Sequence, residues 1–192
     1  MFLEIPNMRA SILIIFILFL HLKSFSQLNI PKFKDTTDIS KFPKDSLLAK
    51  VINESITSVV FSRYSAFTVY KEYSIINYGT DKNWHYNIIT RDGDTYLLLN
   101  ISISQDSIKK LWETIKTNDL FTIQKEWQFD ENCDANIFDS HHYLFWLFAY
   151  NQYRKVHYYD PEHFEANCES NPERRKIIIC ANKFLALRKI TQ

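Results

Sequence analysis

The chain has 192 residues, with 23 Lys and Arg against 22 Asp and Glu, and aromatic residues make up 16% of it. A charge balance this close to neutral gives no electrostatic reason to bind nucleic acid or an anionic membrane, so neither is expected as a partner. Glycine occurs only at Gly79 and Gly93. Without the glycine-rich loops that surround phosphate groups, a nucleotide cofactor is not expected, and no motif indicates another cofactor.

Residues 1–26 have the composition of a secretory signal peptide. The apolar run at 11–22 follows Arg9 and is shorter than the roughly 20 residues that a membrane-spanning helix requires. Ser24 and Ser26 occupy the two small-residue positions of a cleavage site. Cleavage would remove two basic residues and one acidic residue, which leaves a net charge of zero. We therefore expect an exported protein, periplasmic or secreted, without membrane attachment; an uncleaved anchor is the alternative.

Residues 27–44 contain two prolines and no sustained apolar periodicity, which predicts an extended leader. Residues 45–192 are then expected to form a single domain. The domain begins with helical spacing of apolar residues over 45–56, behind a cap at Asp45. The stretch 57–71 favours strand by propensity, but no turn residue separates it from this helix, so its structure stays open.

The next segments predict three strands, two of them in a hairpin. Residues 73–78 have strand propensity, and 84–90 and 95–103 alternate along the chain. Asp92-Gly93 joins the last two segments, and this dipeptide favours a tight turn because glycine accepts a positive φ without steric cost.

The clearest helix signal covers residues 105–118. Ser104 can cap the first turn, and Asn118 is a residue type that enters the left-handed conformation at a helix end. The apolar residues recur at i, i+3, i+4 and i+7, and they are Ile108, Leu111, Trp112 and Ile115. So narrow an apolar stripe is buried against a sheet or against other helices, and strands are predicted on either side of it, so this helix lies between two hairpins.

A second hairpin is predicted over 143–150 and 153–159, with its turn at Asn151. Both alternating faces of 144–148 are apolar. This pattern is typical either of a central strand covered on both sides or of a strand that presents aromatic rings to a partner.

A last helix is predicted from Pro172 to about residue 188, with Asn171 as its cap. Its inner face is expected to contain Ile177, Ala181, Phe184 and Leu187 or Leu185. Basic residues, Arg174 among them, occupy the rest of its surface, which predicts a solvated basic face.

This order of hairpin, capped helix, hairpin and final helix resembles a group of small exported bacterial domains of unknown function. The likeness covers about residues 73–190 and includes Ser-Gln-Asp-Ser-Ile-Lys-Lys-Leu-Trp followed by Asn-Asp-Leu-Phe. The resemblance brings no catalytic motif with it. The elements and the resemblance together predict an α+β fold, with an antiparallel β-sheet packed on one face by about three helices.

Three cysteines follow the leader: Cys133, Cys168 and Cys180. In an oxidising compartment an odd number implies one disulfide and one remaining thiol. Cys180 lies about 13 Å along the last helix at 1.5 Å per residue, which is too far from Cys168 for a bridge. We therefore expect a Cys133–Cys168 disulfide with Cys180 in the core, and Cys133–Cys180 is the alternative.

The segment 130–142 carries most of the candidate metal ligands. Oxygen-bearing side chains at alternate positions match the start of a calcium loop: Asp130, Asn132, Asp134 and Asn136. Ala135 stands where such a loop requires glycine, and His141 where it requires a bidentate carboxylate. The candidate zinc ligands are Asp139, His141, His142, His157 and His163, although none has a known zinc spacing. A flexible polar loop is therefore the preferred interpretation of this segment.

Two function classes follow from these patterns. A non-enzymatic binding or interaction module is preferred, because Tyr153, Tyr158 and Tyr159 could stack on a saccharide or on a protein ligand. The alternative is a metal-assisted hydrolase that uses the His and Asp residues of 139–163. A serine hydrolase is not expected, because no Gly-x-Ser-x-Gly elbow occurs.

Overall fold

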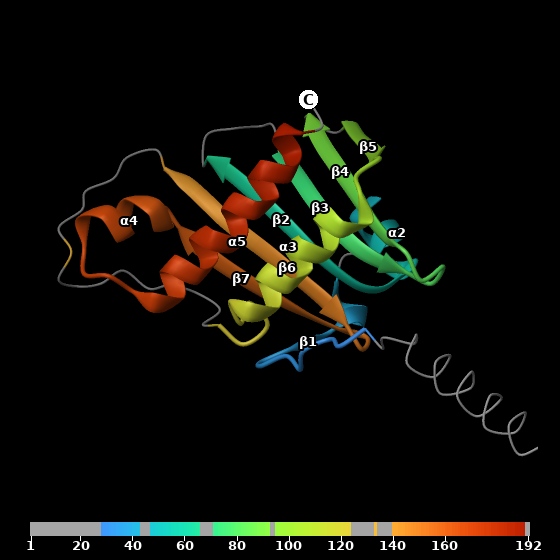
Figure 1. The fold of residues 1–192 in the computed structure, drawn as a ribbon, viewed down its shortest axis with the longest axis horizontal. Helices are drawn as coiled ribbons and strands as arrows, with labels where there is room; N and C mark the ends of the chain where they lie inside the picture. The colour runs from blue at the N-terminus through green and yellow to red at the C-terminus, as the bar shows by residue number, and fades with distance from the viewer. Residues whose placement is uncertain are drawn as a thin grey trace, which may run out of the picture. The chain divides into compact units, whose positions relative to one another are not determined.

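The computed structural model describes residues 28–42, 47–65, 71–92, 95–123, 133 and 140–190. The chain divides into two compact units, Met1–Ile30 and Pro31–Gln192, and all described helices and strands belong to the second. Seven strands form one sheet in the order β1-β7-β6-β2-β3-β4-β5 (Figure 1), and every neighbouring pair is antiparallel. The expected α+β class with an antiparallel sheet is confirmed.

The strands are β1 (Thr37–Asp38), β2 (Ser55–Ser65), β3 (Lys71–Gly79), β4 (Trp84–Asp92), β5 (Thr95–Ile101), β6 (His141–Ala149) and β7 (Gln152–Tyr159). The helices are the 3-10 helix η1 (Ile39–Lys41), α2 (Leu47–Asn53), α3 (Gln105–Thr117), α4 (Pro161–Asn167) and α5 (Pro172–Lys189). Both predicted hairpins form, and the second turns at Tyr150 and Asn151, which have positive φ values of 54° and 58°. Gly93, in the first turn, lies outside the described residues.

Strand β2 occupies much of the stretch 57–71 whose structure the sequence left open. It lies between β3 and β6 in the middle of the sheet, and its residues from 57 to 62 are buried on both faces. Because Ser55 already pairs with Gly79 of β3, the preceding helix α2 ends earlier than the pattern over 45–56 predicts.

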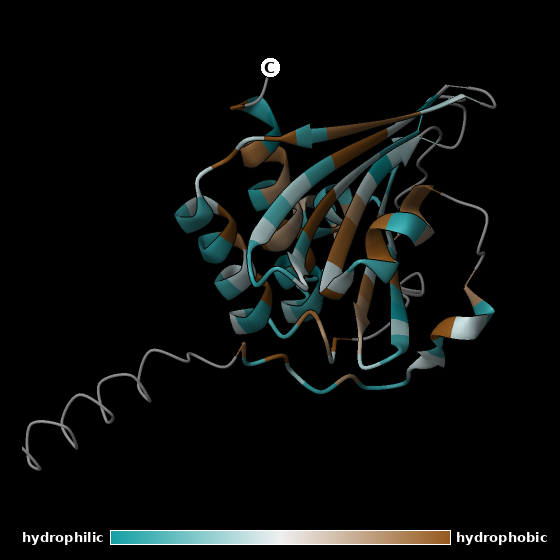
Figure 2. Ribbon diagram, turned by 90° about the vertical axis from the view of Figure 1, so that its right-hand side faces the viewer, coloured by the Kyte–Doolittle hydropathy of each residue, from teal (hydrophilic) through white to brown (hydrophobic). Residues whose placement is uncertain are grey.

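Helices cover both faces of the sheet (Figure 2). Helix α5 packs on one face, where the rings of Phe61 and Phe184 lie 5.4 Å apart between centroids, and α3 packs beside α5. Helix α2 packs on the opposite face, which we call the α2 face. Its core cluster contains Leu48, Val51, Ile52, Val60, Ile75, Ile89 and Phe148. Since Val60 and Phe61 are consecutive on β2, they point to opposite faces, so the helices do not all share the expected single face.

Helix α3 begins close to where the sequence predicts. Ser104 accepts a hydrogen bond of 3.2 Å from a backbone amide of the first turn. Gln105 bonds both backbone groups of Trp84, at 3.0 and 2.7 Å, and this fixes the helix start on β4. The four predicted stripe residues are all buried: Ile108, Leu111, Trp112 and Ile115. The left-handed conformation predicted for Asn118 is wrong, because Asp119 takes it instead, with φ 53°.

Two arginines are buried. Arg154 of β7 donates hydrogen bonds to the carbonyl oxygens of Leu120 and Ile123, just after α3, and burial lowers its pKa because desolvation disfavours the charged form. Arg174 of α5 is fully buried and forms an ion pair of 2.8 Å with Glu165 of α4. The expectation that Arg174 belongs to a solvated basic face is therefore wrong.

Part of the predicted leader, residues 27–44, packs against the domain. Strand β1 pairs with β7, and Phe33 stacks on Phe121 with 5.3 Å between ring centroids. Phe42, at the end of η1, reaches the α2 face. The predicted signal peptide, residues 1–26, lies outside the described residues, and among those that are described no helix is both long and apolar enough to cross a membrane.

Candidate binding site on the α2 face

A pocket of about 300 Å³ lies on the α2 face, next to the part that α2 covers. Five of its eight lining residues are aromatic, and the strands β3 to β7 each contribute at least one residue. The lining residues are Phe42, Leu48, Tyr73, Ile89, Tyr96, Trp146, Tyr153 and Lys155. Because side chains alternate between the faces of a strand, aromatic residues distant in sequence gather here once the strands pair.

The rings of the pocket contact one another. Trp146 and Tyr73 lie 5.7 Å apart between centroids, with planes inclined by 37°. Phe42 lies edge-on to Trp146 at 6.3 Å and to Tyr153 at 5.4 Å. Tyr96, on the edge strand β5, is 41% exposed. These mutual contacts restrict the orientations of Phe42, Tyr73, Trp146 and Tyr153.

Four more rings lie on the α2 face of β2, β6 and β7, and we call them the ring row: Tyr64, His142, His157 and Tyr159. His142 stacks on Tyr64 at 4.9 Å and on His157 at 5.1 Å, and Tyr159 lies 4.9 Å from His142 at an angle of 54°. His142 Nδ1 and His157 Nε2 are 2.9 Å apart, so one imidazole donates a hydrogen bond that the other accepts.

Burial shifts the titration of several groups on this face. It lowers the pKa of His142 below the ordinary value, because desolvation disfavours the imidazolium form. It raises the pKa of Tyr64 and of Tyr73, and for Tyr73 the nearby Tyr96 adds to the rise while the Arg91 guanidinium opposes it. The hydroxyl groups of Tyr64 and Tyr73 therefore stay protonated at neutral pH and can donate hydrogen bonds.

The three predicted stacking residues lie in different places. Tyr153 lines the pocket, and Tyr159 belongs to the ring row. Tyr158 points to the opposite face, is only 1% exposed, and has a pKa that burial raises well above its ordinary value. A partner on the α2 face could therefore reach Tyr153 and Tyr159 but not Tyr158.

The structure brings together two of the candidate metal ligands in its described part, His142 and His157. The carboxylates Asp130, Asp134 and Asp139 are outside that part. His141 and His142 are adjacent on β6 and point to opposite faces, and His142 rather than His141 contacts His157. His163 lies on α4, against the ring of Phe164. Among the residues that the structure describes, no group of three or more His, Cys, Asp or Glu side chains could hold a metal ion.

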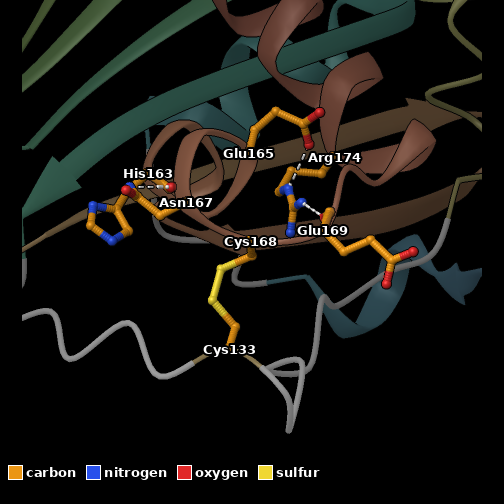
Figure 3. The surroundings of a disulfide bond; sticks show 7 residues. All are labelled: Cys133, His163, Glu165, Asn167, Cys168, Glu169 and Arg174. Atoms are coloured by element: carbon orange, nitrogen blue, oxygen red, sulfur yellow. Dashed lines mark hydrogen bonds and ion pairs between the residues drawn. A yellow bond between two sulfur atoms is a disulfide. The ribbon is translucent and has the colours of Figure 1, made fainter.

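Cys133 and Cys168 form the expected disulfide, with their Cα atoms 5.6 Å apart, and it anchors Cys133 to the end of α4 (Figure 3). Beside it, Arg174 of α5 extends toward Glu165 of α4. Cys180 is buried in the core as expected, and burial raises its pKa to about 12, so the thiol stays protonated. None of the three cysteines lines the pocket.

The sequence patterns do not single out Phe42, Tyr73, Tyr96 or Lys155. Trp146 falls within 144–148, for which the presentation of rings to a partner is one of the two interpretations. The central-strand interpretation is confirmed, because β6 lies between β7 and β2 and most of its residues are buried. Trp146 lines the pocket, and the presentation of rings to a partner stays a prediction. The signal that could have found the site is the repeat along β7, where every second residue is aromatic or basic: Tyr153, Lys155, His157 and Tyr159.

Comparison with known proteins does not assign a function to this site. Comparison of the chain with protein-family models, with curated proteins and with solved structures gives no match. Function is therefore inferred from the residues of the site alone.

Proposed function

We propose that the protein is a non-enzymatic binding module and that its pocket on the α2 face binds a saccharide. The observation that carries this proposal is the group of five aromatic side chains that line one pocket, four of them on β3, β5, β6 and β7 and the fifth directly after η1. A sugar ring presents C–H groups on its faces and hydroxyl groups at its rim. Aromatic side chains with polar tips match both, because the ring packs on the C–H groups and the tip hydrogen-bonds to a hydroxyl.

The size and polarity of the pocket support this proposal. Its volume of about 300 Å³ is at the lower end of the range for small-molecule sites, which suits one sugar residue or a short oligosaccharide. The mutual inclination of Trp146 and Tyr73 offers two apolar surfaces to a ligand. The hydroxyl groups of three tyrosines and the Lys155 ammonium are the hydrogen-bonding groups of the lining.

The chemistry of the lining supports binding rather than hydrolysis. Glycoside hydrolysis typically uses two carboxyl groups on either side of the scissile bond. The residues that line the pocket include no Asp or Glu, and no Ser, Cys or His that could act as a nucleophile or base. A bound saccharide would therefore be held without being cleaved.

The test is isothermal titration calorimetry of the protein, purified from a secreting host, against a panel of neutral and acidic oligosaccharides. We expect at least one member of the panel to bind. Tyr96→Asn removes an exposed ring from the pocket and should weaken that binding by about three- to tenfold.

The matched control is Tyr150→Asn. Tyr150 is 60% exposed, does not line the pocket, and has φ 54°, which asparagine tolerates. This variant should bind as the wild type does. Failure of every saccharide to bind, or equal loss in the two variants, would overturn the proposal.

A further inference from the structure

Basic side chains surround the pocket on the α2 face. Lys155 lines the pocket and pairs directly with Trp146 on the neighbouring strand. Arg91 pairs with Lys71 on one side and with the pocket residue Tyr96 on the other. Directly paired residues of antiparallel strands share a face, so the three basic residues all project on the side of the pocket.

Aromatic rings hold two of these cations in position. The Arg91 guanidinium lies 5.2 Å from the centroid of the Tyr96 ring, and the Lys71 ammonium lies 5.5 Å from that of Tyr64. A cation–π contact orients a cation toward the face of the ring. The charge of Arg91 also opposes the rise that burial causes in the pKa of Tyr73, so Arg91 lies near two residues of the pocket.

Acidic side chains of the same strands belong to the opposite face. Glu72 follows Lys71 on β3 and forms an ion pair of 2.7 Å with Arg188 of α5. In the strand segments that the structure describes, the pairing registers place no Asp or Glu on the α2 face. Helix α2, which borders the pocket, contains no acidic residue in Leu47–Asn53. Among the described strand residues on the α2 face, the formal charges beside the pocket are therefore positive, although the chain as a whole is almost neutral.

We infer that the ligand of this pocket is an acidic saccharide, built from sugar residues that carry a carboxylate. The inference rests on the proposed function, saccharide binding, and specifies that the saccharide is negatively charged. Trp146 and Tyr73 receive the sugar ring, and Lys155 and Arg91 attract the carboxylate at its rim. An acidic sugar carries a carboxylate where a neutral sugar carries a hydroxymethyl group, and the two groups have almost the same volume. Both sugars therefore fit a small pocket, and the basic side chains favour the acidic one.

The experiment compares oligomers that differ in charge alone. The probes are oligomers of galacturonic, glucuronic and mannuronic acid, each beside its carboxyl-reduced neutral counterpart, titrated by calorimetry at low and at physiological salt. We expect at least one acidic oligomer to bind about tenfold or more tightly than its neutral counterpart, with a preference that decreases as salt rises.

Variants assign that preference to the pocket. Lys155→Met keeps the length of an exposed side chain and removes its charge, so it should abolish most of the preference for the acidic oligomer. Lys183→Met removes an equally exposed charge from α5, on the other side of the sheet, and should leave the preference unchanged.

The outcomes separate the two proposals. Equal affinity for an acidic oligomer and its neutral counterpart would overturn the charge of the ligand and leave saccharide binding intact. Binding to none of the oligomers, acidic or neutral, would overturn the proposed function as well. Tighter binding of a poly-glutamate peptide than of every saccharide would assign the site to an acidic peptide, and an equal loss in both lysine variants would show unspecific charge attraction. Either result overturns the inference.

Discussion

Arg154 links the sheet to the end of α3 through one side chain. It is 1% exposed and donates hydrogen bonds to the carbonyl oxygens of Leu120 and Ile123, both buried. Arg154→Met keeps an unbranched apolar stem but removes the guanidinium group, so these two carbonyl groups lose their donor. We expect the free energy of unfolding to fall by about 2 to 4 kcal/mol, measured by urea unfolding.

Arg175→Met is the control for this substitution. Its side chain is 56% exposed and forms only a surface ion pair of 3.7 Å with Glu165, so the same change should cost about 0.5 kcal/mol or less. If Arg154→Met is as stable as the wild type, the buried hydrogen bonds of Arg154 do not stabilise the fold.

His142 gives the fold a dependence on pH. Burial lowers its pKa in the folded state below the unfolded value of 6.5, so around pH 6 the unfolded chain binds more protons. Stability from this residue is complete above the unfolded pKa and is lost as pH falls through it. We therefore expect the melting temperature to decrease between pH 7.5 and 5.5, and to decrease less in His142→Phe, which retains a ring beside Tyr64.

The exposed neighbour His141, which points to the other face, provides the comparison. His141→Phe should keep the pH dependence of the wild type. An unchanged pH dependence in His142→Phe would show that this imidazole does not control acid stability in that interval.

At the scale of the element, α3 is the most exacting test of the fold. Leu111 is 2% exposed, and Leu111→Ala removes buried carbon atoms and leaves a cavity, which should cost about 2 to 5 kcal/mol. Lys109 is exposed, so Lys109→Ala should change stability by about 0.5 kcal/mol or less. Lys116 is a poorer control because it forms an ion pair of 2.7 Å with Glu113. Equal losses in the Leu111 and Lys109 variants by urea unfolding would contradict the orientation of α3.

The disulfide links Cys133, in the connection between α3 and β6, to Cys168 at the end of α4. It closes a loop with a sequence separation of 35 residues, so Cys133→Ser or Cys168→Ser should cost about 2 to 4 kcal/mol. Each variant should also release one thiol to a thiol reagent. Cys180→Ala loses only packing and keeps the bridge, so dithiothreitol should still lower its melting temperature. A bridged Cys180 in peptide mapping would contradict this assignment.

At the scale of the molecule, the two edge strands of the sheet differ in length: β1 has two residues and β5 has seven. β1 pairs with the outer side of β7, whereas β5 forms the other edge. A chain without residues 28–42 would expose the β7 edge and would lose Phe42 from the pocket. We expect its melting temperature to fall by about 5 to 10 °C, and the unpaired edge to cause self-association that rises with concentration.

Sedimentation analysis over a range of concentrations measures this association. A chain that begins at residue 28 is the control and should keep its melting temperature and stay monomeric. A truncated chain that stays monomeric with an unchanged melting temperature would show that β1 and η1 neither stabilise the fold nor protect the edge of β7 from self-association.

The sequence by itself determined the elements that local chemistry specifies. The caps Ser104 and Asn171, the apolar stripe of α3 and the turn at Asn151 act within a few residues, so helix starts and the second hairpin can be predicted without knowledge of the fold. Helix geometry also excludes a bridge between Cys180 and Cys168, whereas the choice of Cys133–Cys168 over the alternative Cys133–Cys180 is confirmed by the structure.

Only the tertiary structure decided the features that depend on pairing between distant segments. β2 joins β6 in a register that brings Thr57 against Ala149, and no local signal specifies that choice. The same pairing sends α2 to the face opposite α3 and α5, buries Arg174 beside Glu165, and gathers the pocket from five strands. Strand alternation determines which face of the sheet a side chain occupies. The strand order determines which side chains lie beside it on that face, and this order depends on how much apolar surface the whole sheet buries.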